Sequence, residues 1–413
     1  MLVGLSVALV AALLTTAVIL GGAWAAEEPA APGATIPSAL APAVPCETGK
    51  GELTIGLIMP LTGPRAAEGT GIRNAVQLAV DEANAACRIP GYRLTLTVAD
   101  DTSTPAKAHS AAKNLAAQPA LVGVIGTFES DTGRVAQSVL GPLDIVQISP
   151  SNRADDLTRG DGQVPRRPYR GYFRLSATDT RQATVAAEHA VIDLGKRSIA
   201  VVHDGSGYGT QLVSSFADRA AELGAGIVAR EQVAPDARDY SPLIAKIAES
   251  RPDLVFCGGD SATAGPLSAQ LGPAGVAPPV MGGHLVADKE FVALGGREGD
   301  LVTSPRVPVA MLPGAAPFLA AYAATGLGPP TSHGPYGYDA AQVLVAALHR
   351  VLASGDWSAH RRAELVDEVQ RTDQPGATGP LAFDEFGDVR NQAVTIYVVE
   401  AAAFVPRAAL SPR

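Results

Sequence analysis

The segment from Leu53 to Ala86 constrains the fold of this chain most, because it predicts a strand, a turn and a helix in immediate succession. Residues 53–59 are apolar, partly β-branched and bounded by turn residues, as in a buried strand. After a turn at 60–64, apolar residues recur at helical spacing, at Ile72, Ala75, Val76, Ala79, Val80 and Ala83. Ligands of open α/β sheets bind beyond the carboxyl ends of the strands. The segment therefore predicts both a parallel α/β sheet and the place of a site.

The rest of the chain continues this alternation. A first series of strands and helices is predicted at 94–98, 104–117, 121–125, 131–140 and 145–149. Residues 151–170 are polar and predict a long loop. A second series follows at 181–194, 198–203, 208–223, 227–233, 240–249, 253–257 and 261–271, and the chain closes with elements at 317–324, 336–353, 359–371, 381–383 and 393–400. Two such series predict an α/β fold with two Rossmann-like parallel-sheet lobes.

Composition favours a globular protein with two sizeable cores. The chain has 413 residues, of which 47% are hydrophobic and 18% charged. Its 41 acidic and 32 basic residues give a net charge of −9, and no basic run stands out. Because nucleic-acid binding requires a positive patch against phosphate, a nucleic-acid partner is not expected.

The N-terminus predicts an extracytoplasmic location. Residues 2–23 carry no charge, and Ala23-Trp24-Ala25 is a small-x-small cleavage pattern. Residues 1–25 are therefore predicted to be a signal peptide or, since about twenty apolar residues can span a bilayer, an uncleaved membrane anchor. The Ala/Pro-rich residues 26–50 predict an extended linker.

The three cysteines predict one disulfide and no metal site. Cys46 precedes the first strand and Cys87 follows the first helix, and a βα unit can bring its two ends within reach. An exported compartment permits a disulfide, so we expect a Cys46–Cys87 bridge. Cys257 lies in an apolar run and is expected to be a small buried residue.

The segment Asp204–Thr210 resembles a dinucleotide-binding fingerprint, because it follows a strand, opens a helix and is rich in glycine. Thr210 replaces the third glycine, and nicotinamide cofactors are scarce outside the cytoplasm. An NAD-dependent enzyme is thus a distant alternative. The chain has no Gly-x-Ser-x-Gly elbow, His-Glu-x-x-His or Walker A loop. We therefore expect no enzyme activity, cofactor or metal.

The residues Ile55–Pro64, with Gly69, Gly71, Asn74 and 81–84, resemble the start of the leucine/isoleucine/valine-binding protein family, the extracytoplasmic solute receptors of ABC importers. The resemblance continues to about residue 400. It implies a type I periplasmic binding protein whose chain crosses between lobes three times, near 177, 304 and 379. The implied division is lobe 1 at 51–177 and 305–378, lobe 2 at 178–304 and 379–405, and a tail at 406–413.

Two loops of lobe 1 are candidates for binding a carboxylate. Ser130 starts a helix after a strand and matches the family's carboxylate-binding serine, although an ordinary helix cap gives the same pattern. The second loop holds Ser151, Asn152 and Arg153, where the family has small residues and a threonine. Arg153 could bind a carboxylate through two hydrogen bonds or point to solvent.

Lobe 2 is expected to meet the other end of the ligand. His284 stands where the family places an acid that pairs with an amine, and Asp179 or Asp260 could substitute. Asp179 matches a cleft aspartate of the family; its alternative role is to cap a helix. Tyr208 matches a tyrosine that faces the cleft, and Tyr336 matches an aromatic helix start that packs on the ligand's side chain.

These features predict a monomeric solute-binding protein that closes two lobes on a small amino-acid-like or carboxylate ligand and docks on an ABC permease. The main alternative keeps the fold but makes the chain a membrane-anchored ligand-sensing ectodomain. Whether the ligand carries an amine stays open, because Asn152, Arg153 and His284 depart from the family pattern.

Overall fold

The computed structural model describes residues 46–411 except 163 and 235–236. All described residues belong to one compact unit, Ile36–Arg413. The predicted signal peptide or anchor at 1–25, and the linker up to residue 45, lie outside the described residues. Within the described part of the chain, no helix is both long and apolar enough to cross a membrane.

The first sheet has five parallel strands in the order β2-β1-β3-β4-β5. Its strands are β1 Gly51–Met59, β2 Tyr92–Asp100, β3 Leu121–Gly126, β4 Val146–Ser149 and β5 Tyr172–Arg174. Strands β3, β4 and β5 are buried along their whole length, and apart from Gln147 and Arg174 their residues are apolar or small. Because all five strands are parallel, the loops that follow them gather at one edge of the sheet.

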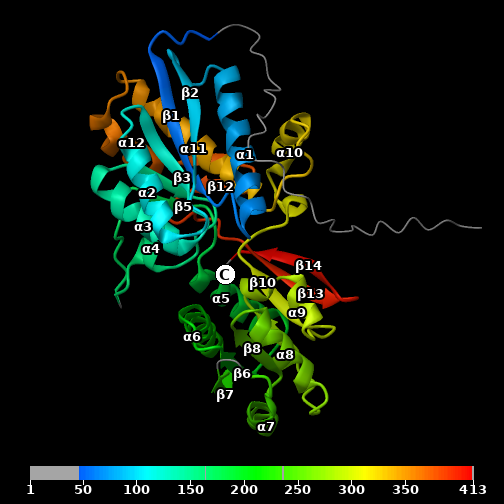
Figure 1. The fold of residues 1–413 in the computed structure, drawn as a ribbon. Coiled ribbons are helices and arrows are strands. Elements are labelled where there is room, and N and C mark those ends of the chain that lie inside the picture. Colours follow the sequence, from blue (N-terminus) through cyan, green and yellow to red (C-terminus); the bar gives the residue numbers. More distant parts are fainter. Residues whose placement is uncertain (1–45, 163, 235–236, 412–413) are drawn as a thin grey trace, which may run out of the picture. The chain divides into compact units, whose positions relative to one another are not determined.

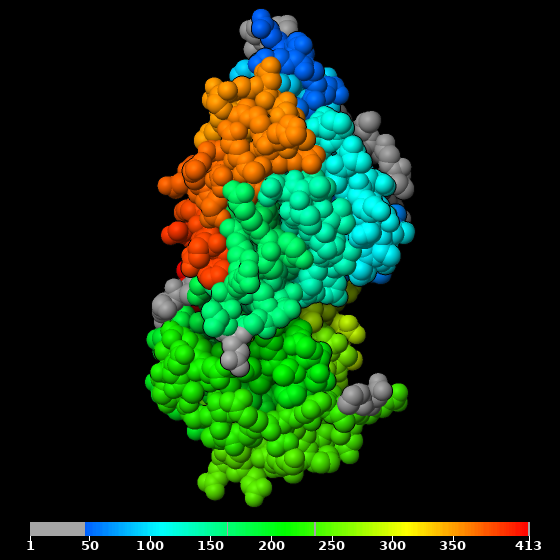
Figure 2. Space-filling model, turned by 90° about the vertical axis from the view of Figure 1, so that its left-hand side faces the viewer, coloured from blue at the N-terminus to red at the C-terminus, as the bar shows by residue number. Residues whose placement is uncertain are grey.

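Helices from two distant parts of the chain cover this sheet (Figure 1). Helix α1 packs against α11, and α2 packs against α3. The helices of this part are α1 Ala66–Ala85, α2 Pro105–Ala116, α3 Ser130–Leu140, α4 Asp156–Arg159, α10 Ala315–Ala324, α11 Gly334–Leu352 and α12 Arg362–Gln370. In Figure 2 the orange residues of the late helices lie against the cyan and green residues of the first sheet's layer. One hydrophobic core accordingly contains residues from 53–175 and from 336–389.

The second sheet has seven strands in the order β14-β13-β10-β9-β8-β6-β7. Strands β7, β6, β8, β9 and β10 are parallel to one another. Strand β13 pairs antiparallel with β10, and β14 pairs antiparallel with β13. The strands are β6 Ser198–His203, β7 Gly226–Gln232, β8 Leu254–Gly258, β9 Val280–Gly282, β10 Leu301–Ser304, β13 Val394–Glu400 and β14 Ala403–Leu410. A separate two-stranded ribbon joins β11 Asp373–Gly376 to β12 Gly379–Ala382.

Five helices accompany the second sheet, namely α5 Asp179–Glu188, α6 Gly207–Glu222, α7 Ser241–Ser250, α8 Ser261–Leu271 and α9 Lys289–Ala293. Short 3₁₀ turns lie at Gly141–Leu143, His284–Val286, Val309–Met311 and Ala359–Arg361. Two apolar clusters fill this part, and both combine residues of 177–302 with residues of β13. The prediction of an α/β fold with two mainly parallel sheets is confirmed.

Three local features differ from the sequence-based expectations. The helix expected at 181–194 ends as α5 at Glu188 and continues as a π-helical turn, His189–Asp193. The expected loop at 151–170 contains the short helix α4. Most of the expected tail, up to Leu410, forms strand β14, because a tight turn at Ala401 and Ala402 folds it back on β13.

The predicted disulfide is confirmed. Cys46 and Cys87 are bonded, with 5.5 Å between their Cα atoms. The bridge ties the residue in front of β1 to the end of α1. It therefore lies at the amino end of β1, away from the loops at the carboxyl end of that strand. Cys257 is a buried free cysteine, as expected, and burial raises the pKa of its thiol to about 12.

Candidate ligand-binding site

Ser130 connects two loops at the carboxyl edge of the first sheet. It is the first residue of α3, and its Oγ accepts hydrogen bonds from the backbone N–H groups of Arg153 and Ala154, both at 3.1 Å. The hydroxyl thus holds the β4–α4 loop rather than capping its own helix. Because the Oγ accepts both bonds, its hydrogen remains available, and no acceptor for it lies among the described residues. Ser130 can therefore donate to a carboxylate.

The side chains of Ser151 and Asn152 are used inside the protein. Both are buried, and both donate to the backbone carbonyls of Thr127 and Phe128. The Oδ1 of Asn152 accepts from the hydroxyl of Tyr172 at 2.9 Å. These two predicted ligand contacts instead fix the shape of the loop, and we leave their side chains out of the site.

Arginine side chains dominate the same edge. Arg153 is half-buried, and its Nη1 donates to the carbonyl of Ser151 at 3.2 Å. Arg306 follows β10, and its Nη1 lies 3.4 Å from His333 Nε2. Arg306 is half-buried, and desolvation together with the charge of Arg153 lowers its pKa to about 10. Neither arginine has an ion-pair partner among the residues that the structure describes.

Phe128 joins this cluster to a third arginine. Its ring packs edge-on against His333, with 4.9 Å between centroids, and Arg65 lies 5.9 Å from the same ring. Arg65 already pairs with Glu68 at 3.6 Å and Glu129 at 3.5 Å. Sequence reasoning missed Arg65, Arg306 and His333. Arg65 and Arg306 each follow a proline in the loop after a strand, and that position could have drawn attention to them.

His284 lies in a fixed hydrogen-bond chain on the second sheet. Gln182 Nε2 donates to the carbonyl and hydroxyl of Thr303, at 2.8 and 2.9 Å, so its Oε1 must face the other way. That Oε1 lies 2.9 Å from His284 Nδ1. Because an amide oxygen only accepts, Nδ1 carries the proton and Nε2 has a free lone pair. Burial, with the charges of nearby arginines, holds the pKa of His284 well below its usual range, so the ring is neutral.

Tyr208 and Asp179 surround His284. The hydroxyl of Tyr208 lies 3.1 Å from His284 Nδ1, and the two rings meet edge-on at 5.0 Å. Asp179 Oδ1 lies 3.8 Å from the same nitrogen, is buried and has no hydrogen-bond partner in the described part of the chain. Burial raises the pKa of Asp179 to about 6, although Arg153 opposes that shift.

The alternative role of Asp179 as a helix cap is filled by its neighbour. Thr178 is the N-cap of α5, and its side chain accepts from the N–H of Arg181. The carboxylate of Asp179 is thus not needed by its own helix. An unpaired buried carboxylate is costly unless a positive group meets it. Asp179 therefore offers an acceptor for an ammonium.

Residues of the two sheets meet at this site. Asp155, in the loop after Arg153, accepts from the N–H of Thr180 at 3.1 Å and from Gln211 Nε2 at 2.9 Å. The charges of Arg153, Arg306 and Arg65 all lower the pKa of His284, so these arginines lie near its ring. The structure thus brings Ser130, Arg153, Asp179, Tyr208 and His284 into one neighbourhood.

Tyr336 and Asp260 have other surroundings. The hydroxyl of Tyr336 accepts from the N–H of Val307 at 3.2 Å, next to Arg306, and the side chain is buried in the first core. Asp260 is exposed and caps α8 by accepting from the N–H and hydroxyl of Thr263. Tyr336 borders the arginine cluster, whereas Asp260 serves its own helix.

The glycine-rich segment 204–210 is a capped helix start. Ser206 is the N-cap of α6 and accepts from the N–H of Gly209 at 2.9 Å. Asp204 accepts from the N–H and hydroxyl of Ser206. These local bonds account for the resemblance to a dinucleotide fingerprint without a nucleotide.

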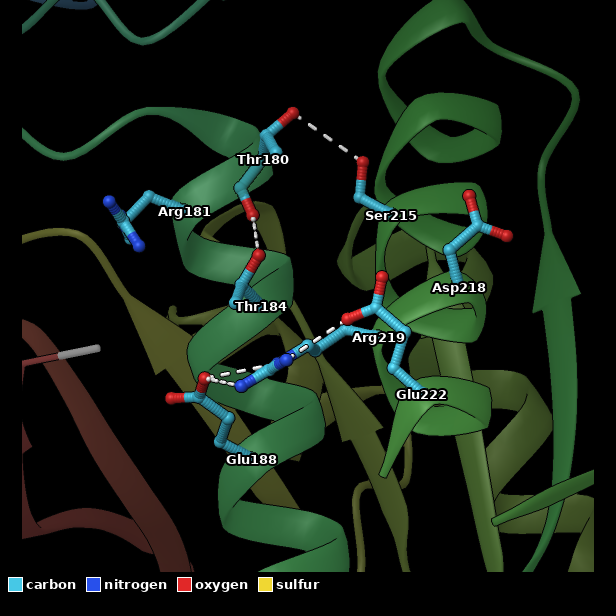
Figure 3. A pocket seen from close by; sticks show the side chains of 8 residues that line it. All are labelled: Thr180, Arg181, Thr184, Glu188, Ser215, Asp218, Arg219 and Glu222. Carbon is cyan, nitrogen blue, oxygen red and sulfur yellow. Dashed lines mark hydrogen bonds and ion pairs between the residues drawn. The ribbon is translucent and has the colours of Figure 1, made fainter. Parts of the chain in front are cut away.

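A polar pocket lies between α5 and α6 (Figure 3). Two of its three acids, Glu188 and Glu222, already pair with Arg219. It is lined by Thr180, Arg181, Thr184, Glu188, Ser215, Asp218, Arg219 and Glu222, and Asp179 and Gln182 are not among these residues. Among residues 46–411, apart from 163 and 235–236, no group of His, Cys, Asp or Glu could hold a metal ion.

Comparison with known proteins decides the family. Residues 52–403 match the family profile described as "Periplasmic binding protein". This chain belongs to the periplasmic binding protein family. The resemblance expected from the opening segment is thus confirmed, and because the family consists of binding proteins, the enzyme alternative is dropped. Membership also implies an extracytoplasmic location and an ABC-transporter context.

Individual relatives cover most of the chain. The Leu/Ile/Val-binding protein homolog 3 of Brucella melitensis is 29% identical over 348 residues, which are 84% of this chain and 91% of that protein. An ABC-transporter protein of Rhodospirillum rubrum is 28% identical, with a TM-score of 0.70 over 86% of this chain and 100% of its own. A substrate-binding protein of Desulfitobacterium hafniense in complex with Leu shares the fold at 24% identity, with a TM-score of 0.71 over 86% and 100% of the two chains.

Proposed function

We propose that this periplasmic binding protein captures a small amino-acid-like or carboxylate solute and delivers it to an ABC permease. One observation carries the proposal: opposite, unsatisfied charges face a single site. Asp179 supplies a buried acceptor without a partner, while Arg153 and the hydroxyl of Ser130 supply donors. A free amino acid presents the complementary pair, an ammonium and a carboxylate.

In this proposal the two ends of the ligand meet different sheets. Ser130 and Arg153 bind the carboxylate through charge-assisted hydrogen bonds. Asp179 receives the ammonium, and the lone pair of His284 Nε2 accepts a second of its hydrogens. Because His284 Nδ1 carries its proton, Tyr208 Oη does not donate to that nitrogen, and its hydrogen can turn to the ligand. The relatives' names support an amino-acid ligand.

The proposed lobes are 51–177 with 305–378 and 178–304 with 379–405. The shared cores support this division, because residues 336–389 pack with the first sheet and β13 packs with the second. A ligand that contacts both lobes binds the closed arrangement better than the open one and shifts the population toward it. The closed receptor, a monomer, then docks on the permease.

The N-terminus decides between two forms of the same receptor. A signal peptide cleaved before Ala26 would release it, whereas an uncleaved segment 2–23 would tether it to the membrane and would also suit a sensing ectodomain. N-terminal sequencing of the mature protein distinguishes them, since a start at Ala26 supports the free receptor.

Calorimetry with a panel of amino acids, amides and small carboxylates tests the proposal. We expect one of these solutes to bind and to raise the melting temperature. Ser130→Ala should weaken that binding about 10- to 100-fold, since it removes one hydrogen bond to a charged group. Ser138→Ala, at an exposed position of the same helix, is the matched control. If no member of the panel binds, the receptor function is wrong; if Ser130→Ala binds as well as Ser138→Ala, the carboxylate site is wrong.

A further inference from the structure

Arg306 is the least compensated charge of the site. Several buried or half-buried arginines of this protein have a carboxylate partner, for example Arg174 with Asp388 at 2.5 Å and Arg219 with Glu188 at 2.7 Å. Arg306 has only the neutral nitrogen of His333 at 3.4 Å. A guanidinium has five N–H donors, so most of its hydrogen-bonding capacity is unused.

The surroundings of Arg306 add donors and positive charge. Because a guanidinium only donates, His333 Nε2 must accept, and its Nδ1 then carries a proton. That buried Nδ1 has no acceptor among the described residues. The charge of Arg153 also reaches Arg306. The surroundings of Arg306, which we call the Arg306 corner, therefore contain two cationic groups, Arg153 and Arg306, and the unused N–H donor of His333.

The nearby carboxylates do not compensate these groups. Glu68 influences Arg306, but it is paired with Arg65, whose second partner is Glu129. Both glutamates are about one-third exposed, so water screens them. An unpaired guanidinium held away from water is unfavourable, because its lost hydration is not replaced. A ligand that brought an anionic group to Arg306 would replace the lost hydration of this guanidinium.

We propose that the solute is an acidic amino acid, whose second carboxylate binds to Arg306. This inference rests on the proposed function and extends it from a carboxylate and an ammonium to a third charged group. Arg153 and Arg306 then match two carboxylates, and Asp179 matches one ammonium. His333 Nε2 accepts from Arg306 and orients its guanidinium toward the ligand.

An aliphatic side chain would fit this corner poorly. A leucine-like ligand would cover Arg306 with methyl groups and remove its water without supplying an acceptor. The chain is thus expected to differ in specificity from the relative named as a Leu/Ile/Val-binding protein homolog. A site built around a charged hydrogen-bonding group rejects the analogue that lacks it more strongly than an apolar pocket rejects a missing methylene.

The test compares ligands that differ in one group. Affinities of the purified, ligand-free protein are measured by calorimetry for L-glutamate, L-glutamine, L-aspartate, L-asparagine, L-leucine and benzoate. We expect at least one acid to bind at least about 30-fold more tightly than its own amide and than leucine. If leucine, an amide or benzoate binds best, the acidic-ligand inference is wrong and the receptor function stands. If none of the six compounds binds, the result contradicts both the acidic-ligand inference and the receptor function.

Substitution of Arg306 connects the preference to this residue. Arg306→Met should remove most of the preference for the acid over its amide, whereas Arg306→Lys should keep part of it. Exposed Arg238, which has no ion-pair partner in the described part of the chain, provides the control Arg238→Met. Circular dichroism shows whether each variant folds; should Arg306→Met fail to fold, Arg306→Lys alone must reduce the preference. An unchanged preference in the folded variant would overturn the inference.

Discussion

At the scale of single residues, function depends on which polar atoms the protein itself satisfies. Ser151 and Asn152 look like ligand contacts in the sequence, yet their donor hydrogens are used by the carbonyls of Thr127 and Phe128. Asp179 looks like a helix cap, yet Thr178 caps that helix. Residue type and spacing do not reveal which partner satisfies each polar side chain, because the partners depend on the positions of neighbouring loops.

The raised pKa of Asp179 gives a testable pH dependence. Burial raises it from 3.8 to about 6, so the stability that its protonated form contributes is fully present below pH 3.8 and is lost as the pH rises through 6. An amine ligand needs the ionised form, so its affinity should fall below pH 6. Calorimetry between pH 5 and 8 measures this fall.

Asp179→Asn separates the two effects of this carboxylate. The variant should bind an amine ligand weakly and with little pH dependence over the same range. Without ligand at pH 8 it should be more stable, by about 1–3 kcal/mol, because no charge is buried. Exposed Asp260 provides the control Asp260→Asn. Wild-type pH dependence in Asp179→Asn would rule out this assignment.

At the scale of elements, the sequence predicts strands and helices well where apolar periodicity is strong. The expected unit at 53–86 is β1 followed by α1, and the alternation up to α8 is present. The prediction is wrong where tertiary contacts decide: β14 forms because β13 offers an edge, and α5 passes into a π-helical turn. Sequence reasoning missed Arg306 and His333, because no sequence pattern links these two residues.

 In the fold, Arg306 and His333 are 27 residues apart along the chain, and they meet only because the loop after β10 and the start of α11 lie side by side.

The disulfide stabilises a single pair of elements, because it links the two ends of the β1–α1 unit. Replacing both Cys46 and Cys87 with serine should lower the free energy of unfolding by about 3–4 kcal/mol, as expected for a closed loop of 41 residues. Ligand affinity should stay unchanged, since the bridge lies at the opposite end of β1 from the site. Urea unfolding and calorimetry of the double variant measure the two quantities. Unchanged stability, or a clear loss of affinity, would contradict this account.

At the scale of the whole molecule, segments distant in sequence share cores. The buried ion pair of Arg174 with Asp388 joins the end of β5 to the segment that precedes β13. Apolar periodicity identifies the faces that such segments bury, but it does not show which sheet covers them. The family resemblance, rather than the periodicity, therefore led to the discontinuous lobes that we propose.

A crystal structure with the bound solute tests the central claim most directly. The expected result is that the solute contacts Ser130 and Arg153 through a carboxylate and Asp179 through an ammonium, so that both proposed lobes touch one molecule. A solute bound elsewhere, for example in the pocket between α5 and α6, or touching only one lobe, would contradict it.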